Sequence, residues 1–304
     1  MHLPDGFLAA PVSGALYVAS GAALGAAVRR AGDESEPGAA APTMGLTAAF
    51  LFVAQMLNFP IAGGTSGHLL GATLATALLG PWRGLLVLTV VVAIQAFGFA
   101  DGGVVVLGAN VFNMAVAGCL LSAVVLSAAR RLWLARPVAL GVAAWLSVML
   151  AAALTAVELA ASGRVAAGVV LPAMLSVHAV IGVGEALLTV AAYNLLVHHR
   201  RLPGAGVWTG GQGAEPWRLG VVLVLGLLLL RLACPHPDGL ESVARAQGFA
   251  VAATEVYRGA PLPDYALPGR SESVGAWVSA VAGIVACGGL MLAVGSGFRR
   301  RTAS

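Results

Sequence analysis

The first seven residues, MHLPDGF, place a histidine directly behind the first methionine. The Met1 amine, the His2 amide and the His2 imidazole are three nitrogens on one short piece of backbone, and together they can close two fused chelate rings. Three nitrogens in one plane suit a divalent ion that accepts square-planar geometry, which favours nickel, copper and, less well, cobalt. Residues 4–6 are turn formers that would fold this segment back on the following helix. The alternative is a frayed and solvated chain end.

Irregular backbone is expected over residues 58–68, NFPIAGGTSGH, where three glycines, a proline and two hydroxyl side chains interrupt the apolar sequence. At membrane depth such backbone survives only when it is buried in protein or lines a cavity. His68, at the end of this segment, is either a structural histidine or a fourth nitrogen for the ion.

Polar residues inside the later apolar runs are weaker signals. Asn110 and Asn113 are one helical turn apart, where they either orient the metal-binding groups or bond neighbouring helices. His178 and Glu185 share a helix face, either as a functional relay or as a packing pair joined by a hydrogen bond. The supporting or structural candidates are Asp5, Asn58, Ser66, Asn110, Asn113, His178 and Glu185.

The sequence contains no catalytic set of a known kind. The patterns HExxH, GxSxG and GxxxxGK are absent, and the chain has no lysine. We therefore expect no enzymatic activity, and any work driven by ATP must be done by a partner.

Composition places the chain in a membrane. Of its 304 residues, 59% are hydrophobic and only 10% are charged, and the mean hydropathy is +0.90. A soluble protein of this length could not stay dissolved with so little charge. The net charge of +4 comes from arginines in short clusters between apolar runs, which argues against binding of nucleic acid.

We expect an all-α polytopic membrane protein with about seven spans, followed by a two-span C-terminal module. The apolar runs cover about residues 7–28, 44–59, 68–79, 84–100, 108–126, 137–161, 165–196, 219–233 and 274–295. The third run is short, which predicts a tilted or partly re-entrant element. Residues 1–200 would form a metal-binding membrane domain, residues 201–217 a Gly-rich linker, and residues 218–304 an accessory module with an external loop.

The predicted orientation follows from the arginines. Most of the 17 arginines lie on the connections after odd-numbered spans and on the C-terminal tail, so the positive-inside rule predicts the N-terminus outside and the C-terminus inside. Arg29 and Arg30 follow the first apolar run, whereas a signal peptide carries its charge before that run, so we expect the first two residues to stay on the chain. His68 then lies on the membrane face of the N-terminal chelate, which favours a role as ligand.

Several long motifs resemble the CbiM/NikM family, the cobalt/nickel substrate-binding component of energy-coupling-factor transporters. They are MHLPDGF at residues 1–7, NFPIAGGTSGHLLG at 58–71, DGGVVVLGANVFNM at 101–114 and HAVIGVGE at 178–185. Leu3 stands where the family commonly has isoleucine. Residues 218–301, with PDGLE at 237–241, resemble the family's small CbiN/NikN-like accessory subunit, which is here fused to the first domain.

This resemblance implies a binding site and a set of partners. The Met1 amine, the His2 amide and imidazole, and the His68 imidazole would bind Co²⁺ or Ni²⁺, the transported ligand, in a near-planar site of four nitrogens. The partners would be a transmembrane coupling subunit and two cytosolic ATPases. The chain would then be a multi-pass component of the cell membrane that supplies metal for cobalamin biosynthesis or nickel enzymes.

Two other classes of protein stay open. A metal channel or secondary transporter without ATPases would need a continuous polar pathway, whereas the polar groups gather near the external face. An intramembrane metalloenzyme would use His178 and Glu185 as ligand and base, and would need a further ligand pair that the sequence lacks. His236 either delivers metal or is polar surface, and residues 198–199 are expected at the cytoplasmic interface.

Overall fold

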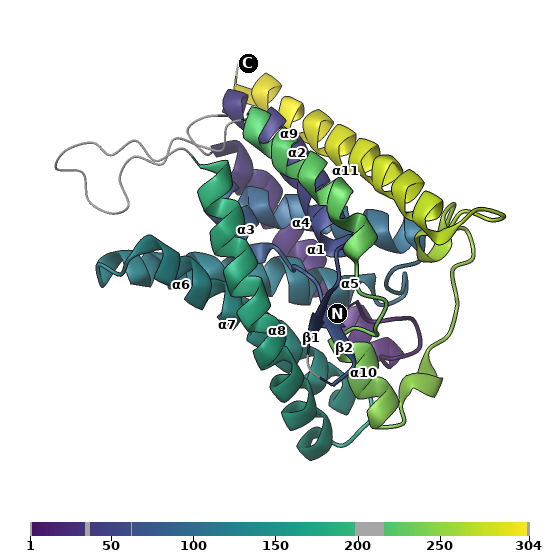
Figure 1. The fold of residues 1–304 in the computed structure, drawn as a ribbon. Helices are drawn as coiled ribbons and strands as arrows, with labels where there is room; N and C mark the ends of the chain where they lie inside the picture. Colours follow the sequence, from purple (N-terminus) through teal and green to yellow (C-terminus); the bar gives the residue numbers. More distant parts are fainter. Residues whose placement is uncertain (1, 34–36, 62, 198–215, 303–304) are drawn as a thin grey trace.

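A computed structural model of the chain describes residues 2–33, 37–61, 63–197 and 216–302 (Figure 1). Its helices and strands are α1 (Ala10–Asp33), α2 (Pro37–Met56), β1 (Phe59–Ile61), β2 (Thr65–Gly67), α3 (Ala72–Leu79), α4 (Pro81–Phe99), α5 (Leu107–Val111), the π-helix η1 (Phe112–Ala117), α6 (Gly118–Arg131), α7 (Arg136–Ala161), α8 (Ala167–Leu196), α9 (Pro216–Leu229), α10 (Gly239–Ala246) and α11 (Glu272–Thr302). Short 3-10 turns lie at η2 (Leu230–Leu232), η3 (Ala250–Ala252) and η4 (Pro263–Tyr265). Met1, His198, His199 and most of the expected linker lie outside the described residues.

The expectation of a helical, polytopic membrane protein is confirmed. Six helical segments of the described chain are long and apolar enough to cross a membrane. They are Ala10–Ala31, Pro81–Phe99, Leu107–Arg131, Arg136–Ala161, Ala167–Leu196 and Glu272–Phe298. A shorter apolar helix covers Ala41–Met56. The total of nine spans and the side of the membrane on which each end lies stay predictions.

The third expected span, residues 68–79, is helical only in its second part. α3 has eight residues and is about 12 Å long at a rise of 1.5 Å per residue, far less than the ~30 Å of a hydrocarbon core. Gly71 before it has a φ of 81°, and a β-carbon at Gly71 would lie 2.3 Å from Leu51 Cδ2. The helix therefore begins only at Ala72, and residues 68–71 are non-helical.

The irregular backbone predicted between α2 and α3 is a small antiparallel hairpin, which the expectation of an all-α chain did not include. In it Phe59 pairs with Gly67 and Ile61 with Thr65. Gly63 and Gly64 at its tip have φ angles of 77° and 71°, a left-handed conformation that glycine adopts at little cost. The hairpin leads directly into the non-helical segment that carries His68.

The C-terminal segment packs into the body of the molecule. Both α9 and α11 lie against α2 (Figure 1), and a β-carbon at Gly283 of α11 would lie only 1.9 Å from Phe52 Cε1 of α2. The connection between α9 and α11 also bonds to the first part of the chain. The Cys234 N–H donates to the Asn58 carbonyl at 2.8 Å, and the Leu262 N–H donates to the Gly98 carbonyl at 3.1 Å.

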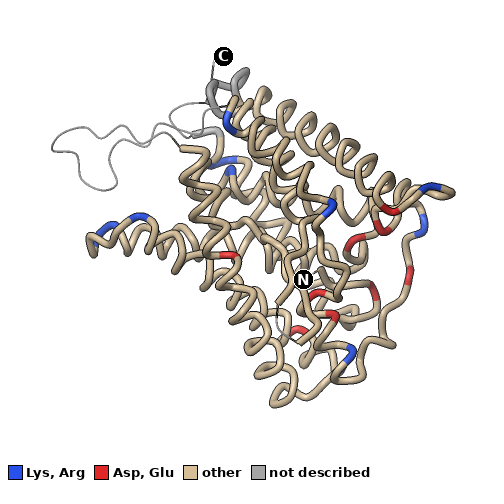
Figure 2. Tube along the Cα trace, in the orientation of Figure 1, with Lys and Arg blue, Asp and Glu red and all other residues tan. Residues whose placement is uncertain are grey.

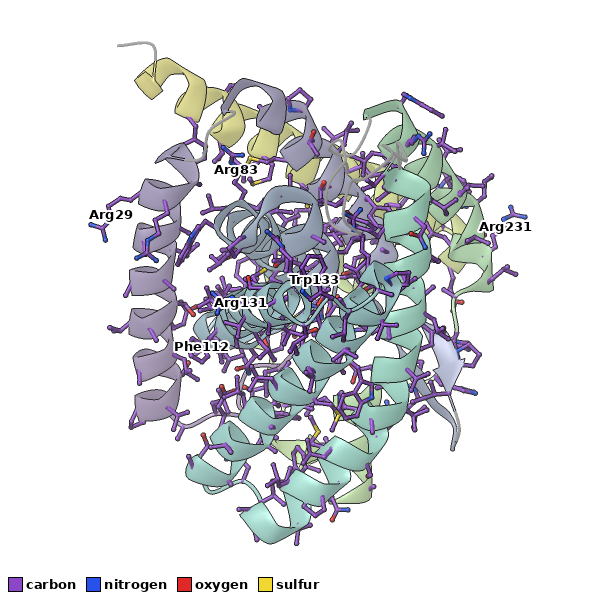
Figure 3. All side chains as sticks on the ribbon, turned by 90° about the vertical axis from the view of Figure 1, so that its left-hand side faces the viewer. Arg29, Arg83, Phe112, Arg131, Trp133 and Arg231 are labelled. Atoms are coloured by element: carbon purple, nitrogen blue, oxygen red, sulfur yellow. The ribbon has the colours of Figure 1, made fainter. Side chains whose placement is uncertain are left out.

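Charge is unevenly distributed over the molecule. Acidic residues gather around the N-terminus and the loop before α11, whereas arginines lie at the tip of α6, near the C-terminus and on that loop (Figure 2). In Figure 3, Arg29 points away from α1, while Arg131 and Trp133 mark the end of α6. Arg83 is buried instead, and its Nη2 donates to the Ala31 carbonyl near the end of α1 at 3.2 Å.

Candidate metal site

The imidazole rings of His2 and His68 lie side by side. Their centres are 5.6 Å apart and their planes differ by 4°. The side chain of His2 is 6% exposed, and His68 is buried as well. Two imidazoles that bind one ion through bonds of about 2 Å have ring centres roughly 4–6 Å apart. The structure thus brings two of the predicted ligands within reach of one ion, while the third predicted ligand, Met1, lies outside the described residues.

Hydrogen bonds to both the N–H and the carbonyl of Leu3 hold the N-terminal segment in place. The Leu3 N–H donates to Asn110 Oδ1 at 2.8 Å, and Asn110 Nδ2 donates to the Leu3 carbonyl at 3.0 Å. The N–H of Gly103 donates to the same carbonyl at 2.8 Å. Leu3 is fully buried, so the alternative of a frayed and solvated chain end does not apply to residues 2–7.

Asp5 fastens the turn that follows. Its Oδ1 accepts the N–H of Val105 at 2.8 Å, and its carbonyl accepts the N–H of Thr254 at 2.8 Å. A β-carbon at Gly103 would lie 2.1 Å from Asp5 Oδ1, so the loop after α4 can approach this closely only with glycine there. Asp5 therefore positions the segment that carries His2.

The ring of His2 is held by an aspartate. Asp101 Oδ1 lies 2.9 Å from His2 Nδ1, and Asp101 Oδ2 accepts the Tyr265 hydroxyl at 2.5 Å. Burial of Asp101 disfavours its ionised form, but the charge and hydrogen bond of His2 and the hydroxyl of Tyr265 outweigh burial and hold the pKa of Asp101 below its ordinary value. A fused chelate of amine, amide and imidazole uses Nδ1, so an incoming ion would take the place of Asp101 at that nitrogen.

The imidazole of His68 is held in its neutral form, with one nitrogen available to a metal ion. Its Nδ1 lies 3.2 Å from the Leu69 carbonyl; because a carbonyl only accepts, Nδ1 carries the proton and Nε2 carries the lone pair. Burial, together with the positive charge of nearby His2, lowers the pKa of His68 from 6.5 to about 3. The ring is therefore in the uncharged form that binds metal ions.

His178 and Glu185 serve different partners. Glu185 accepts the N–H groups of Leu70 at 2.6 Å and Gly71 at 2.9 Å. His178 Nδ1 instead donates to the Met174 carbonyl one turn earlier in α8, at 2.7 Å. One of the two expected roles, a packing pair in which His178 and Glu185 bond each other, is therefore wrong. Glu185 bonds the backbone before α3 instead.

Asn110 and Asn113 also have different roles, although they share a helix face. Asn113 Nδ2 donates to Glu158 Oε2 at 2.9 Å and to Thr155 Oγ1 at 3.2 Å, both on α7. It is thus an interhelical hydrogen-bonding residue, whereas Asn110 binds the N-terminal segment. Asn113 lies in the first turn of the π-helix η1.

Asn58 and Ser66 attach the C-terminal segment to the hairpin. The Asn58 carbonyl accepts the N–H of Cys234. Ser66 Oγ donates to the His236 carbonyl at 2.8 Å, and the Ser66 N–H donates to the Pro237 carbonyl at 2.8 Å. These contacts make the loop before α10 an extension of the small sheet, which places this loop beside His68.

A cavity of about 720 Å³ opens at this junction. Its lining includes His2, His68, Asp101, His236, Asp238 and Tyr265. Asp101, Asp238 and Tyr265 were not among the candidates from the sequence. Asp101 and Asp238 stand in two of the motifs that carry the family resemblance, DGGVVVLGANVFNM and PDGLE, but neither was given a role, and Tyr265 stands in a polar loop that gave no signal.

Side chains alone do not form a metal site here. Within the described part of the chain, no group of three or more His, Cys, Asp or Glu side chains is placed to hold a metal ion. An ion between His2 and His68 would therefore need backbone nitrogens, as the chelate predicted from the sequence supplies.

Two family models match different parts of the chain. The family model described as "Cobalt uptake substrate-specific transmembrane region", CbiM, matches residues 2–202, and the PDGLE domain model matches residues 217–300. A protein of Archaeoglobus fulgidus with the name "Putative fused nickel transport protein NikMN" is 34% identical over 99% of this chain and 98% of its own length. The protein named "Cobalt transport protein CbiM" of Geobacter sulfurreducens is 32% identical over 78% of this chain and 72% of its own length.

A solved structure is similar as well. The crystal structure of a truncated transition metal transporter has a TM-score of 0.57 and 32% sequence identity, and the match covers 64% of this chain and 97% of that one.

Proposed function

Because the chain belongs to the CbiM family of cobalt uptake substrate-specific transmembrane regions and carries a PDGLE domain at its C-terminal end, we propose that it is the substrate-specific membrane subunit of an ATP-driven energy-coupling-factor transporter. It binds external Co²⁺ or Ni²⁺ and delivers the ion inward. The imported metal would supply cobalamin biosynthesis or nickel enzymes.

The observation that carries this proposal is the pair of stacked imidazoles beside a clamped N-terminal segment. The ligands would be the Met1 amine, the His2 amide and imidazole, and the His68 imidazole. Four nitrogens near one plane suit ions that accept square-planar coordination and disfavour ions that require six oxygen ligands. Because the amide must lose its proton, binding should release protons and weaken at low pH.

The proposed partners follow from the family resemblance, and they are consistent with what the sequence lacks. Its sequence has no phosphate-binding GxxxxGK loop and no lysine. ATP would therefore be hydrolysed by two cytosolic ATPases, and a transmembrane coupling subunit would pass the movement to this chain. Within the chain, residues 1–200 would form the metal-binding domain, residues 201–217 a linker and residues 218–304 the accessory module.

The substitution His2→Ala tests the binding site. The change removes the imidazole that closes the second chelate ring, so we expect the affinity for Ni²⁺ and Co²⁺ to fall at least about ten-fold in titrations of the purified protein. His236→Ala is the matched control, because His236 lines the same cavity but is not a proposed ligand. Equal binding by His2→Ala and the wild type would show that the chain terminus is not the site.

Transport in proteoliposomes tests the division of labour. Vesicles with this chain alone should bind metal without accumulating it, and vesicles that also hold the coupling subunit, the ATPases and internal ATP should accumulate it. Accumulation by the chain alone would instead indicate a channel or a secondary transporter.

A further inference from the structure

We propose that Glu185 is the positioning residue for His68: its carboxylate fixes the backbone that carries this ligand and so completes the coordination of the ion. This inference rests on the proposed function, since it assumes that His68 binds the ion.

The carboxylate of Glu185 accepts hydrogen bonds from backbone N–H groups that have no partner in a helix or strand. β2 ends at Gly67 and α3 begins at Ala72, so residues 68–71 belong to neither element. Backbone N–H groups that are buried without a partner are costly, and those at the start of a helix have no partner within the helix. Both oxygens of the fully buried Glu185 accept such groups, at 2.6 Å from Leu70 and 2.9 Å from Gly71.

The bonded groups are close to the ligand along the chain. Leu69 separates Leu70 from His68, and the Leu69 carbonyl holds His68 Nδ1 at 3.2 Å. A displacement of the backbone at Leu70 would therefore move the carbonyl that sets the orientation of the imidazole. Gln55 fastens the same place from α2, because its Nε2 donates to the Leu70 carbonyl at 2.9 Å.

A second buried glutamate provides the comparison. Glu158 on α7 is also buried, but it accepts from Asn113 on η1 and bonds no residue of the 68–71 segment. Glu158→Gln therefore changes a buried carboxylate in the membrane domain without touching the backbone that carries His68.

Glu185→Gln keeps the size of the side chain and changes its bonding. One acceptor oxygen becomes an NH₂ donor that faces a backbone N–H, so the segment must shift. We expect the affinity for Ni²⁺ to fall about 10–100-fold, as is usual when a group that orients a metal ligand is replaced. With His68 displaced, water would take the fourth position, and because water is a weaker-field ligand than imidazole, the d–d absorption band of bound Ni²⁺ would move to longer wavelength.

The experiment is a titration of the purified full-length chain with Ni²⁺, followed by absorption spectroscopy, for the wild type, Glu185→Gln, His68→Ala, the double variant and Glu158→Gln. We expect Glu185→Gln to reproduce the spectrum of His68→Ala, and the double variant to bind no more weakly than His68→Ala, because both changes remove the same ligand. Glu158→Gln should keep the spectrum of the wild type.

Two results would overturn the inference. One is a wild-type spectrum and affinity for Glu185→Gln. The other is a full addition of the two losses in the double variant, which would mean that Glu185 acts apart from His68. If Glu185→Gln does not fold, Glu185→Asp provides the test. This variant keeps the carboxylate on a shorter side chain, so we expect it to bind Ni²⁺ more weakly than the wild type and to show a partial shift of the d–d band. A wild type that binds no Ni²⁺ would instead contradict the proposed function.

Discussion

The hydroxyl of Tyr265 donates a hydrogen bond of 2.5 Å to Asp101, across 164 residues of sequence. Asp101 in turn holds the ring of His2 through a contact of 2.9 Å. The C-terminal segment, which contains Tyr265, is thus connected to the ring of His2 through the carboxylate of Asp101. In this chain the accessory segment forms part of the wall of the candidate metal site.

Tyr265→Phe should loosen this connection. The change removes only the hydroxyl, while the ring that stacks on Phe99 with centres 4.9 Å apart is kept. Because a hydrogen bond to a charged group contributes about 1.5–3 kcal/mol, we expect a lower unfolding temperature in detergent and faster proteolysis of the loop at residues 253–271. Tyr257→Phe is the control, because Tyr257 lies in the same loop and its ring makes an edge contact with Phe97, with ring centres 5.6 Å apart. Equal proteolysis of both variants would contradict the prediction.

Asn110→Ala should weaken metal binding. It removes the two hydrogen bonds that Asn110 makes with Leu3 and leaves the bond from the Gly103 N–H, and a loosened N-terminal segment must be ordered again each time the ion binds. We expect the affinity for Ni²⁺ to fall about ten-fold in titrations. Asn113→Ala, three residues later, should leave the affinity near that of the wild type and lower only stability, because Asn113 bonds Glu158 and Thr155. The reverse pattern would show that the two asparagines have been assigned the wrong roles.

Local features of the site could be predicted from the sequence. The nitrogens of Met1 and His2 that we propose as ligands are neighbours on the chain, so this proposal needs no knowledge of the fold. The glycines at residues 63–64 and the proline before them break a helix wherever they stand, so irregular backbone before His68 was foreseeable. The direction of the chain at His68 could not be predicted, because the position of the hairpin depends on hydrogen bonds with segments that are distant in the sequence.

Contacts between distant segments could not be predicted. Helical periodicity places Glu185 and His178 on one face of α8, but it does not say which backbone packs against that face. Tyr265 lies in a polar loop whose composition indicates only exposure, and its partner follows from the docking of that loop on α4. The sequence indicated that the third apolar run is short, but the start of α3 only at Ala72 goes with the close approach of Gly71 to Leu51, which no local pattern encodes.

Gly283→Ala should disturb the packing of α11 on α2. An added β-carbon would lie 1.9 Å from Phe52 Cε1, and Phe52 is fully buried. Overpacking of this kind costs about 1–3 kcal/mol, so we expect a lower unfolding temperature in detergent. Gly289→Ala on the same helix is the control, because nothing lies within 4 Å of its added β-carbon; it should keep or raise stability. A loss at Gly289 equal to that at Gly283 would contradict this packing.

Mild acid should destabilise the metal-free protein through His68, which lies outside the candidate spans. The pKa of His68 falls from 6.5 in the unfolded chain to about 3 in the folded protein. Between these values the unfolded chain takes up a proton on this side chain and the folded protein does not. The contribution of His68 to stability is thus complete above pH 6.5 and is lost as the pH falls toward 3, by at most about 1.4 kcal/mol for each pH unit.

Thermal unfolding in detergent with a chelator present, at pH 7 and pH 5, measures this loss. We expect the wild type to lose more stability than His68→Gln between the two values, by roughly 1–2 kcal/mol. Other titrating groups are common to both proteins, so the difference reports His68 together with its coupling to the charges of His2, Asp101 and Asp238. Equal losses in the two proteins would mean that the ring of His68 takes up its proton in the folded state. At pH 5 that proton would compete with the ion for Nε2.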